Sequence, residues 1–332
     1  MSQFGMLRSA GINYDAGVLR MVHHVMAEAG ISFAMGRGRV FYVDPVNGND
    51  NNSGRTPRKA VATLAVGEAL LTTGRHDTLV LIGGATAATI TDTLDWDKNC
   101  THLIGVSAPS SNPRAMIEVS GTDSAVAGLA VSGYGCIMAN FKIVQLTSLA
   151  ACGAISESGG RNYYWNVEID GQYGANARGS ATAYSLLLNN AEETKFDKCV
   201  IGLDTVVRTA GSAIRFASSS RRNEFHNCII RSACTTATVG LVKYASLEAC
   251  DRYTWFDRCL FYNFYANHGA KLNEVFTIQA NMATHDIILD NCMAVGFTQW
   301  AENDRGCIWV VGPAGVAGTA GSGSSGIAVE PS

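Results

Sequence analysis

The sequence predicts an all-β solenoid in which short strands coil about one axis, three to a turn. The first observation is a repeat: residues 194–201 read Thr-Lys-Phe-Asp-Lys-Cys-Val-Ile, and related octads follow at 223–230, 254–261 and 286–292. The second is its spacing, because equivalent positions lie 26, 32, 29, 31 and 33 residues apart, and a varying period of this size is typical of solenoid turns that carry loops. The equivalent positions are Phe141, Val167, Cys199, Cys228, Cys259 and Cys292.

Composition excludes several classes of protein. Of 332 residues, 47% are hydrophobic and 16% charged, which is a globular rather than a disordered composition. The net charge of −3, with no basic cluster beyond Arg221 and Arg222, argues against a nucleic-acid partner. No apolar run reaches the roughly 18 residues of a membrane helix, and the first residues do not form a signal peptide. We expect no membrane partner and synthesis in a cytoplasm.

Residues 1–38 precede the repeats and form an N-terminal arm. Asp15 can cap an amphipathic helix that ends at Gly30. We expect this helix to anchor the protein in an assembly, or to pack on its own solenoid. His23 and His24 lie beside its apolar face, and we interpret them as surface or packing residues rather than metal ligands. The residues of the apolar face are Val18, Leu19, Val22, Val25 and Met26.

The solenoid is expected over residues 39–311 and opens with a strand at 39–44. A turn-rich loop at 45–54 follows, which we expect to be held by Asn and Asp side chains rather than by calcium. Pro57 then opens a short helical region, and a helix near 60–72 is expected to cover the open end of the stack. Residues 76–84 read as the next strand.

These opening elements resemble the right-handed parallel β-helix proteins of the pectin-lyase-like family. The matching residues are Tyr42-Val43-Asp44, Gly48-Asn49-Asp50, Gly54-Arg55-Thr56-Pro57 and His76-Asp77-Thr78, where histidine replaces the usual glycine. The resemblance implies a right-handed, single-stranded parallel β-helix with an N-terminal capping helix. It does not imply one activity, because the family includes polysaccharide lyases, hydrolases, virus tailspikes and inert virion proteins. The catalytic signatures of its polygalacturonases are absent, and the calcium aspartates of its pectate lyases find no match.

The repeat itself predicts a corner. Phe196 and Cys199 are both apolar but three residues apart, so one straight strand would put them on opposite faces. A bend at Lys198 lets both point inward. The equivalent bends are Asn140, Asn166, Asn227, Arg258 and Asn291, mostly asparagine, which tolerates left-handed backbone geometry.

Further strands precede each corner, for example near 185–188 and 213–216, which gives three strands per coil and about eight or nine coils. The recurring cysteines occupy an inward position, so we expect reduced, buried thiols rather than disulfides or metal ligands. Residues 312–332 are rich in Gly, Ala and Ser and are expected to form a C-terminal arm, since three Gly triplets are too few for collagen.

The same register places one polar face outside the coils. Its acids and histidine could serve catalysis, and its aromatic side chains could contact a glycan or a protein partner. A mixed polar face is more typical of an ordinary sheet surface or a subunit interface. The catalytic candidates are Asp197, His226, Asp257 and Asp290, and the contact candidates are Tyr163, Trp165 and Trp255.

We therefore predict a non-enzymatic bacteriophage virion protein, acting in capsid decoration or in a tail fibre or spike. The expected partners are two further copies in a homotrimer and a major capsid or tail protein, with no cofactor and no metal. The alternative is a polysaccharide depolymerase, a lyase or a hydrolase, or a glycan-binding module, acting on bacterial surface glycans.

Overall fold

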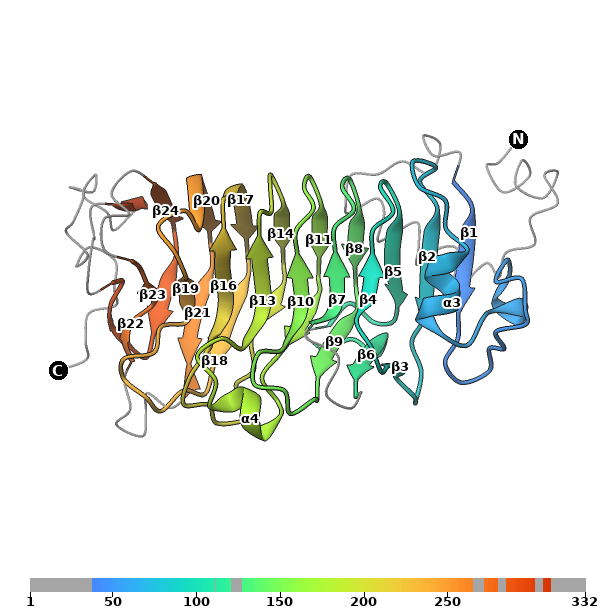
Figure 1. The fold of residues 1–332 in the computed structure, drawn as a ribbon, viewed down its shortest axis with the longest axis horizontal. Helices are drawn as coiled ribbons and strands as arrows, with labels where there is room; N and C mark the ends of the chain where they lie inside the picture. Colours follow the sequence, from blue (N-terminus) through green and yellow to red (C-terminus); the bar gives the residue numbers. More distant parts are fainter. Residues whose placement is uncertain are drawn as a thin grey trace.

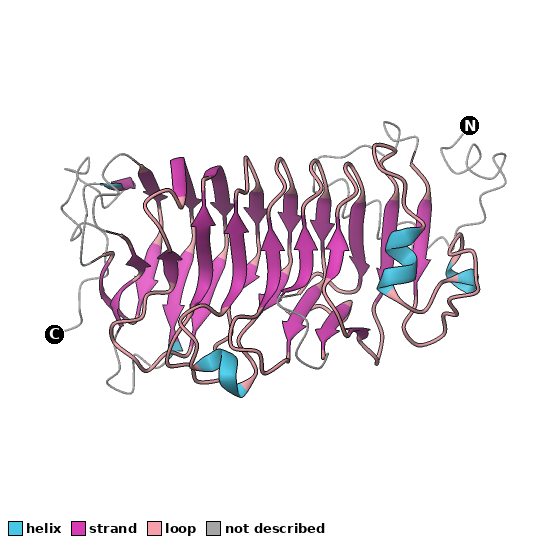
Figure 2. Cartoon of the chain, viewed as in Figure 1, coloured by secondary structure: helices cyan, strands magenta, loops and turns pink. Residues whose placement is uncertain are grey.

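The computed structural model describes residues 38–110, 112–120, 127–264, 272–279, 285–301 and 307–311. These residues form a parallel β-helix, a rod in which successive coils stack side by side (Figure 1). The predicted all-β class is confirmed, because strands and loops build nearly the whole rod and helices are few (Figure 2). The predicted helix of the N-terminal arm and the C-terminal arm 312–332 lie outside the described residues.

Sheet A, the longest sheet, has ten parallel strands and runs the length of the rod. Its strands in order are β1 (Val40–Val43), β2 (Thr78–Ile82), β5 (His102–Val106), β8 (Ile137–Ala139), β11 (Tyr163–Trp165), β14 (Lys195–Asp197), β17 (Ser220–His226), β20 (Cys250–Asp257), β24 (Asp286–Asp290) and β27 (Ile308–Val311).

Sheets B and C complete the cross-section with eight and seven strands. Sheet B contains β3 (Ala88–Ile90), β6 (Met116–Val119), β9 (Lys142–Gln145), β12 (Glu168–Asp170), β15 (Val200–Ile201), β18 (Ile229–Ser232), β21 (Leu260–Asn263) and β25 (Met293–Val295). Sheet C contains β4 (Leu94–Trp96), β7 (Ala127–Val131), β10 (Gly153–Glu157), β13 (Tyr184–Asn189), β16 (Ser212–Ser218), β19 (Val242–Tyr244) and β23 (Phe276–Thr277). A fourth sheet pairs β22 (Leu272–Glu274) with β26 (Phe297–Gln299).

Each coil runs from sheet A to sheet B to sheet C, and seven described coils have a strand in all three. The expected number was eight or nine. The difference arises at the ends: β1 begins the stack alone, sheet C ends at β23, and among the described strands the β24 coil pairs its β26 with β22 in the fourth sheet.

The predicted corners are confirmed between sheets A and B. All six bend residues have positive φ, from 49° at Asn166 to 57° at Asn140, so the backbone is left-handed at each. The bend separates strand pairs such as β14 and β15, and lets Phe196 and Cys199 both enter the core.

Stacked aromatic rings fill the core beneath sheet A. The centroids of Tyr164 and Phe196 are 4.6 Å apart, those of Phe196 and Phe225 are 4.7 Å apart, and those of Phe225 and Phe256 are 4.8 Å apart. These separations follow the distance between neighbouring strands. All ten cysteines are free, as expected. The thiols of the repeat bond backbone oxygens of the preceding coil, for example Cys228 Sγ with Phe196 O at 3.5 Å.

The N-terminal end of the stack carries the expected helix. It is shorter than expected: α3 spans Leu64–Ala69, after a 3-10 turn at Pro57–Lys59. Asp50 holds the start of α3, because its carboxylate accepts bonds from the backbone N–H groups of Ala62 and Thr63. Asp44 likewise accepts from the backbone of its own turn, as predicted. A second short helix, α4 (Ala175–Arg178), lies in a loop outside the coils. Neither described helix is long and apolar enough to cross a membrane.

Candidate functional site

The predicted polar face lies on the outer surface of sheet A, over β11, β14, β17, β20 and β24. Strand register aligns Trp165, Asp197, His226, Asp257 and Asp290 in one column that runs from coil to coil. A second column, two residues earlier on each strand, contains Tyr163, Lys195, Glu224, Trp255 and Ile288. Sequence reasoning therefore placed these residues together correctly.

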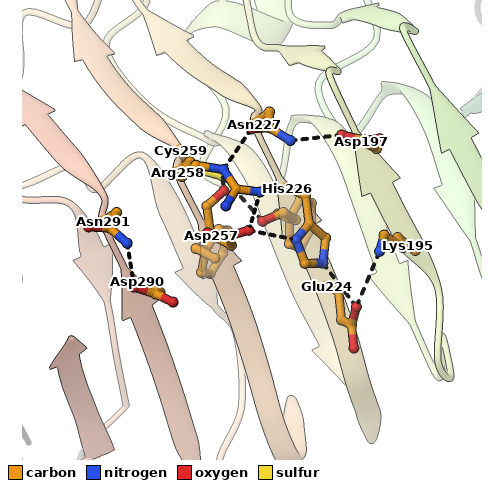
Figure 3. A network of polar contacts seen from close by, with 12 residues as sticks. Lys195, Asp197, Glu224, His226, Asn227, Asp257, Arg258, Cys259, Asp290 and Asn291 are labelled. Atoms are coloured by element: carbon orange, nitrogen blue, oxygen red, sulfur yellow. Dashed lines mark hydrogen bonds and ion pairs between the residues drawn. The ribbon is translucent and has the colours of Figure 1, made fainter. Parts of the chain in front are cut away.

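Asp197 is held by its neighbours on both sides. The Tyr163 hydroxyl, one coil before, donates to Asp197 Oδ2 at 3.2 Å. The Asn227 amide, one coil after, donates to Asp197 Oδ1 at 3.1 Å (Figure 3). Asn227 Oδ1 in turn accepts a bond of 2.9 Å from Arg258 Nε. These contacts join four successive coils through side chains.

His226 lies between two carboxylates (Figure 3). Its Nδ1 is 3.0 Å from Asp257 Oδ2, and its Nε2 is 2.9 Å from Glu224 Oε2. Ionised carboxylates only accept hydrogen bonds, so both contacts form together when the ring carries a proton on each nitrogen. Arg258 Nη2 lies 2.7 Å from Asp257 Oδ2, and Lys195 Nζ lies 3.9 Å from Glu224 Oε2.

A catalytic role in glycoside hydrolysis requires a pair of carboxylates that face an open site. Asp197 and Asp257 have the His226 ring between them in the column, rather than open space for a water and a sugar. Asp257 is only 5% exposed and is enclosed by His226 and Arg258. Asp290, its neighbour in the column, accepts from the adjacent Asn291 amide at 2.8 Å. The acids are thus engaged in contacts within and between coils.

The predicted aromatic contacts are only partly accessible. Trp165 is 5% exposed, and the Lys198 ammonium lies 5.7 Å from its ring centroid, within the range of a cation–π contact. The Trp255 ring meets the His226 ring edge to face with centroids 5.1 Å apart. Tyr163 and Trp255 remain half-buried. Trp165 and Trp255 therefore pack against side chains of sheet A and offer little exposed ring surface for stacking on a sugar.

A groove on the outer surface of sheet B was not predicted. It has a volume of about 600 Å3, and four charged side chains meet along it. Lys142 Nζ lies 3.0 Å from Glu168 Oε1 and 2.8 Å from Asp170 Oδ2. Arg231 Nη2 lies 2.7 Å from Glu168 Oε1 and 3.4 Å from Asp170 Oδ1. The two carboxylates therefore share two cations.

The local sequence makes this cluster possible. Gly202 directly follows β15, in which Ile201 is in register with Ile169 of β12 and Ile230 of β18, so the chain between Asp170 and Arg231 has no side chain at this position. Arg231 reaches across Gly202 and donates from Nε to its carbonyl oxygen at 3.0 Å. A larger residue at 202 would also strain the backbone, whose φ is 100°.

Burial and charge set the protonation of the groove. Burial raises the pKa of Glu168, and the neighbouring Asp170 carboxylate raises it further. Burial by itself lowers the pKa of Lys142, but the attraction of Asp170 and Glu168 is stronger, so that pKa is raised overall. Extending the outward register past each corner would have found the groove, because Lys142 and Glu168 occupy equivalent positions in successive coils.

No group of three or more His, Cys, Asp or Glu side chains in the described parts of the chain could hold a metal ion. The outer face of sheet A and the groove are instead networks of paired charges. The contacts on the outer face of sheet A hold neighbouring coils together. The groove on sheet B can offer charged hydrogen-bond donors and acceptors to a polar molecule.

Known proteins resemble this chain in fold but not in sequence. The sequence matches no protein family model and no curated protein. Among solved structures, the chain is similar to ORF18 of Geobacillus virus E2, with 10% identity and a TM-score of 0.46, over 83% of this chain and 62% of that protein. The chain thus spans under two thirds of that protein's length.

Two further similar structures differ from each other in function. One is the pectin methylesterase PemA from Erwinia chrysanthemi, with 11% identity, a TM-score of 0.43, and coverage of 84% of this chain and 91% of that one. The other is the Dettilon tailspike protein, with 14% identity, a TM-score of 0.40, and coverage of 82% and 59%. At such low identity the similarity concerns the parallel β-helix fold alone.

Proposed function

We propose that this protein is a non-enzymatic structural protein of a bacteriophage particle. In this proposal it decorates the capsid or forms part of a tail fibre or spike, and it assembles as a trimer. The assignment to a phage follows the sequence resemblance to β-helix virion proteins.

The observation that carries the proposal is the direction of the contacts on the outer face of sheet A. Asp197, Glu224 and Asp257 each bond side chains of neighbouring coils. A catalytic acid must be able to reach the bond of a substrate. Side-chain contacts between coils instead hold the coils of the stack together. The polar face thus suits a rigid rod.

The C-terminal end of the rod offers a surface for assembly. Met293 and Val295 on β25 and Trp309 and Val311 on β27 are large apolar side chains that remain exposed. They lie on the last strands of sheets B and A, where the described part of the stack ends. Exposed apolar groups gathered at one end are typical of a protein contact. The proposed partner is a major capsid or tail protein of the particle.

The proposal is tested by imaging and by assay. Labelled protein should appear as a rod on the capsid or tail of purified particles. Incubation with bacterial capsular glycans should release neither reducing ends nor unsaturated sugars. Glycan turnover that Asp257→Asn abolishes, while the matched exposed variant Asp95→Asn retains it, would refute the non-enzymatic role.

A second candidate function, glycan binding without cleavage, is favoured by the groove on sheet B. Charged groups that both donate and accept, with the half-exposed ring of Tyr173 among the lining residues, are suited to sugar hydroxyls and a sugar face. Asp204 also lines the groove and lies 3.6 Å from Arg231 Nε.

Saturation-transfer NMR with capsular oligosaccharides tests this second function. Binding that Tyr173→Ala and Asp204→Asn weaken, and that Tyr134→Ala leaves unchanged, would support it. Tyr134 is a suitable control because it is exposed to a similar degree and is not among the groove residues. Absence of transfer from every oligosaccharide would exclude the groove as a glycan site.

A further inference from the structure

The outer face of sheet A changes character along the rod. The inward-pointing residues of sheet A belong to the main core along the whole rod. The outward column that contains Asp197 and Asp257 begins instead with five apolar residues. These five align across five consecutive strands, and we call them the outer patch. They are Tyr42, Val80, Ile104, Ala139 and Trp165.

The outer patch is as buried as the core. Val80, Ile104 and Ala139 have no exposed surface, although they point away from the interior of the coils. His102, in the neighbouring outward column, is 3% exposed and accepts a bond from the backbone of Ile137. Farther along the same columns, Asp197 and Glu224 are charged and half-buried. At its ends the patch packs with described residues, since Ala60 belongs to the same buried cluster and the Lys198 ammonium lies over the Trp165 ring. The burial of Val80, Ile104 and Ala139 between them calls for a further covering segment.

We propose that the amphipathic helix predicted between Asp15 and Gly30 covers the outer patch of its own chain. The dimensions agree. Five strands spaced about 4.8 Å apart extend roughly 19 Å from first to last. A helix of 14 residues is about 21 Å long. A helix parallel to the rod axis would therefore cross all five strands.

The chemistry of the two faces agrees as well. The helix has one apolar stripe, and the patch is apolar along one straight column. Docking would bury the stripe against the side chains that need cover. The stripe consists of Val18, Leu19, Val22, Val25 and Met26.

The position of the connecting chain favours the same molecule over a neighbour. The described chain enters sheet A at β1, where the Arg39 carbonyl accepts from Thr78 N–H at 2.8 Å, so the segment before it is attached at the first of the five strands of the outer patch. The eight residues 31–38 between helix and sheet extend at most about 29 Å. This length exceeds the roughly 19 Å spanned by the five strands, so the connecting residues could join β1 to a helix lying over the outer patch.

The inference is independent of the proposed function and changes the role expected for the N-terminal arm. If the apolar stripe of the predicted helix packs on sheet A, it is not available to bind another protein. Partners of the rod then meet the charged half of sheet A, sheet B with its groove, or the C-terminal end.

Site-specific photo-crosslinking in the full chain tests the inference. A benzophenone amino acid replaces Val22, on the apolar stripe, or Arg20, on the opposite side of the helix, as the matched control. We expect position 22 to crosslink within one chain to tryptic peptides that contain Val80, Ile104 or Ala139, and position 20 to lose these products.

Two results would overturn the inference. One is intrachain crosslinks from position 22 that map elsewhere than sheet A. The other is crosslinks found only between chains, as dimers on a denaturing gel, which would assign the stripe to a second copy. Because both substitutions lie outside the β-helix, unchanged thermal unfolding shows that the rod itself is intact.

Discussion

Glu157 shows how burial in the coil stack alters one side chain. It has no exposed surface, and its Oε1 accepts bonds of 2.9 Å from the Gly159 N–H and from Asn162 Nδ2. Oε2 contacts the Tyr164 hydroxyl. Burial raises the pKa of Glu157 to about 7 from 4.5, although these hydrogen bonds oppose the shift.

We therefore expect Glu157 to make stability depend on pH. The folded chain holds the Glu157 proton more tightly than the unfolded chain, so this stabilisation is complete at acidic pH and is lost as pH rises from about 4.5 to about 7. Glu157→Gln should remove this loss, worth roughly 3 kcal/mol at most. Denaturant unfolding of both proteins over this range measures it, and parallel pH profiles would contradict the prediction.

His102 should change the stability in the opposite direction over nearly the same pH range. Burial, helped by the nearby His76, lowers the pKa of His102 from 6.5 to about 4. Below pH 6.5 the unfolded chain gains a proton that the folded chain refuses, so stability should fall as pH drops from 6.5 to about 4. His102→Gln should flatten this acid limb in thermal unfolding scans. An unchanged limb would show that other groups cause it.

At the scale of elements, the residues at the corners between sheets A and B set both the turn of the chain and the contact between coils. Asn140 has no exposed surface, and its amide donates 3.0 Å bonds to the carbonyls of Gly105 and Ser107. It also accepts a bond of 2.7 Å from the Asn166 amide in the next coil. One residue type thus supplies both the left-handed turn and the contact between coils.

Asn140→Ala should destabilise the fold by about 2–4 kcal/mol, because alanine disfavours left-handed geometry and removes the hydrogen bonds to the carbonyls of Gly105 and Ser107. The matched variant Asn291→Ala lies at an exposed corner near the end of the rod and should cost less. Denaturant midpoints of the two variants compare them directly. Equal losses would show that backbone geometry alone determines the cost.

At the scale of the whole molecule, stacking in register turns local contacts into continuous surfaces. One face of sheet A is an apolar patch followed by a charged network, and one face of sheet B holds a groove followed by apolar residues such as Met293. A rod with different surfaces along its length can bind different neighbours at each level. This division suits a protein that works inside a larger assembly.

The proposed trimer has a simple test. Light scattering coupled to gel filtration should give a mass near three times the 35.2 kDa of one chain. A mass that stays at one chain over a wide range of concentration would refute self-assembly. Val295→Lys, which places a charge at the exposed end of β25, tests whether that end takes part.

The sequence alone determined the solenoid, its corners and the two outward columns of sheet A. It could do so because a strand alternates with period two, and because one left-handed residue at each corner between sheets A and B, an asparagine in four of the six repeats, resets that alternation. The strand, the bend at Asn227 and the inward Cys228 all lie within a single octad, 223–230, so these features are local.

Only the tertiary structure decided which polar residues are accessible and which are enclosed. Asp257 belongs to an outward column but is buried between His226 and Arg258, and Lys142 meets Arg231 only through the carboxylates of the coil between. The contacts between coils depend on side chains reaching residues 26 to 63 positions away in sequence, across coils whose loops differ in length. Period and composition do not specify such contacts, because register between coils is set by the packing of the whole stack.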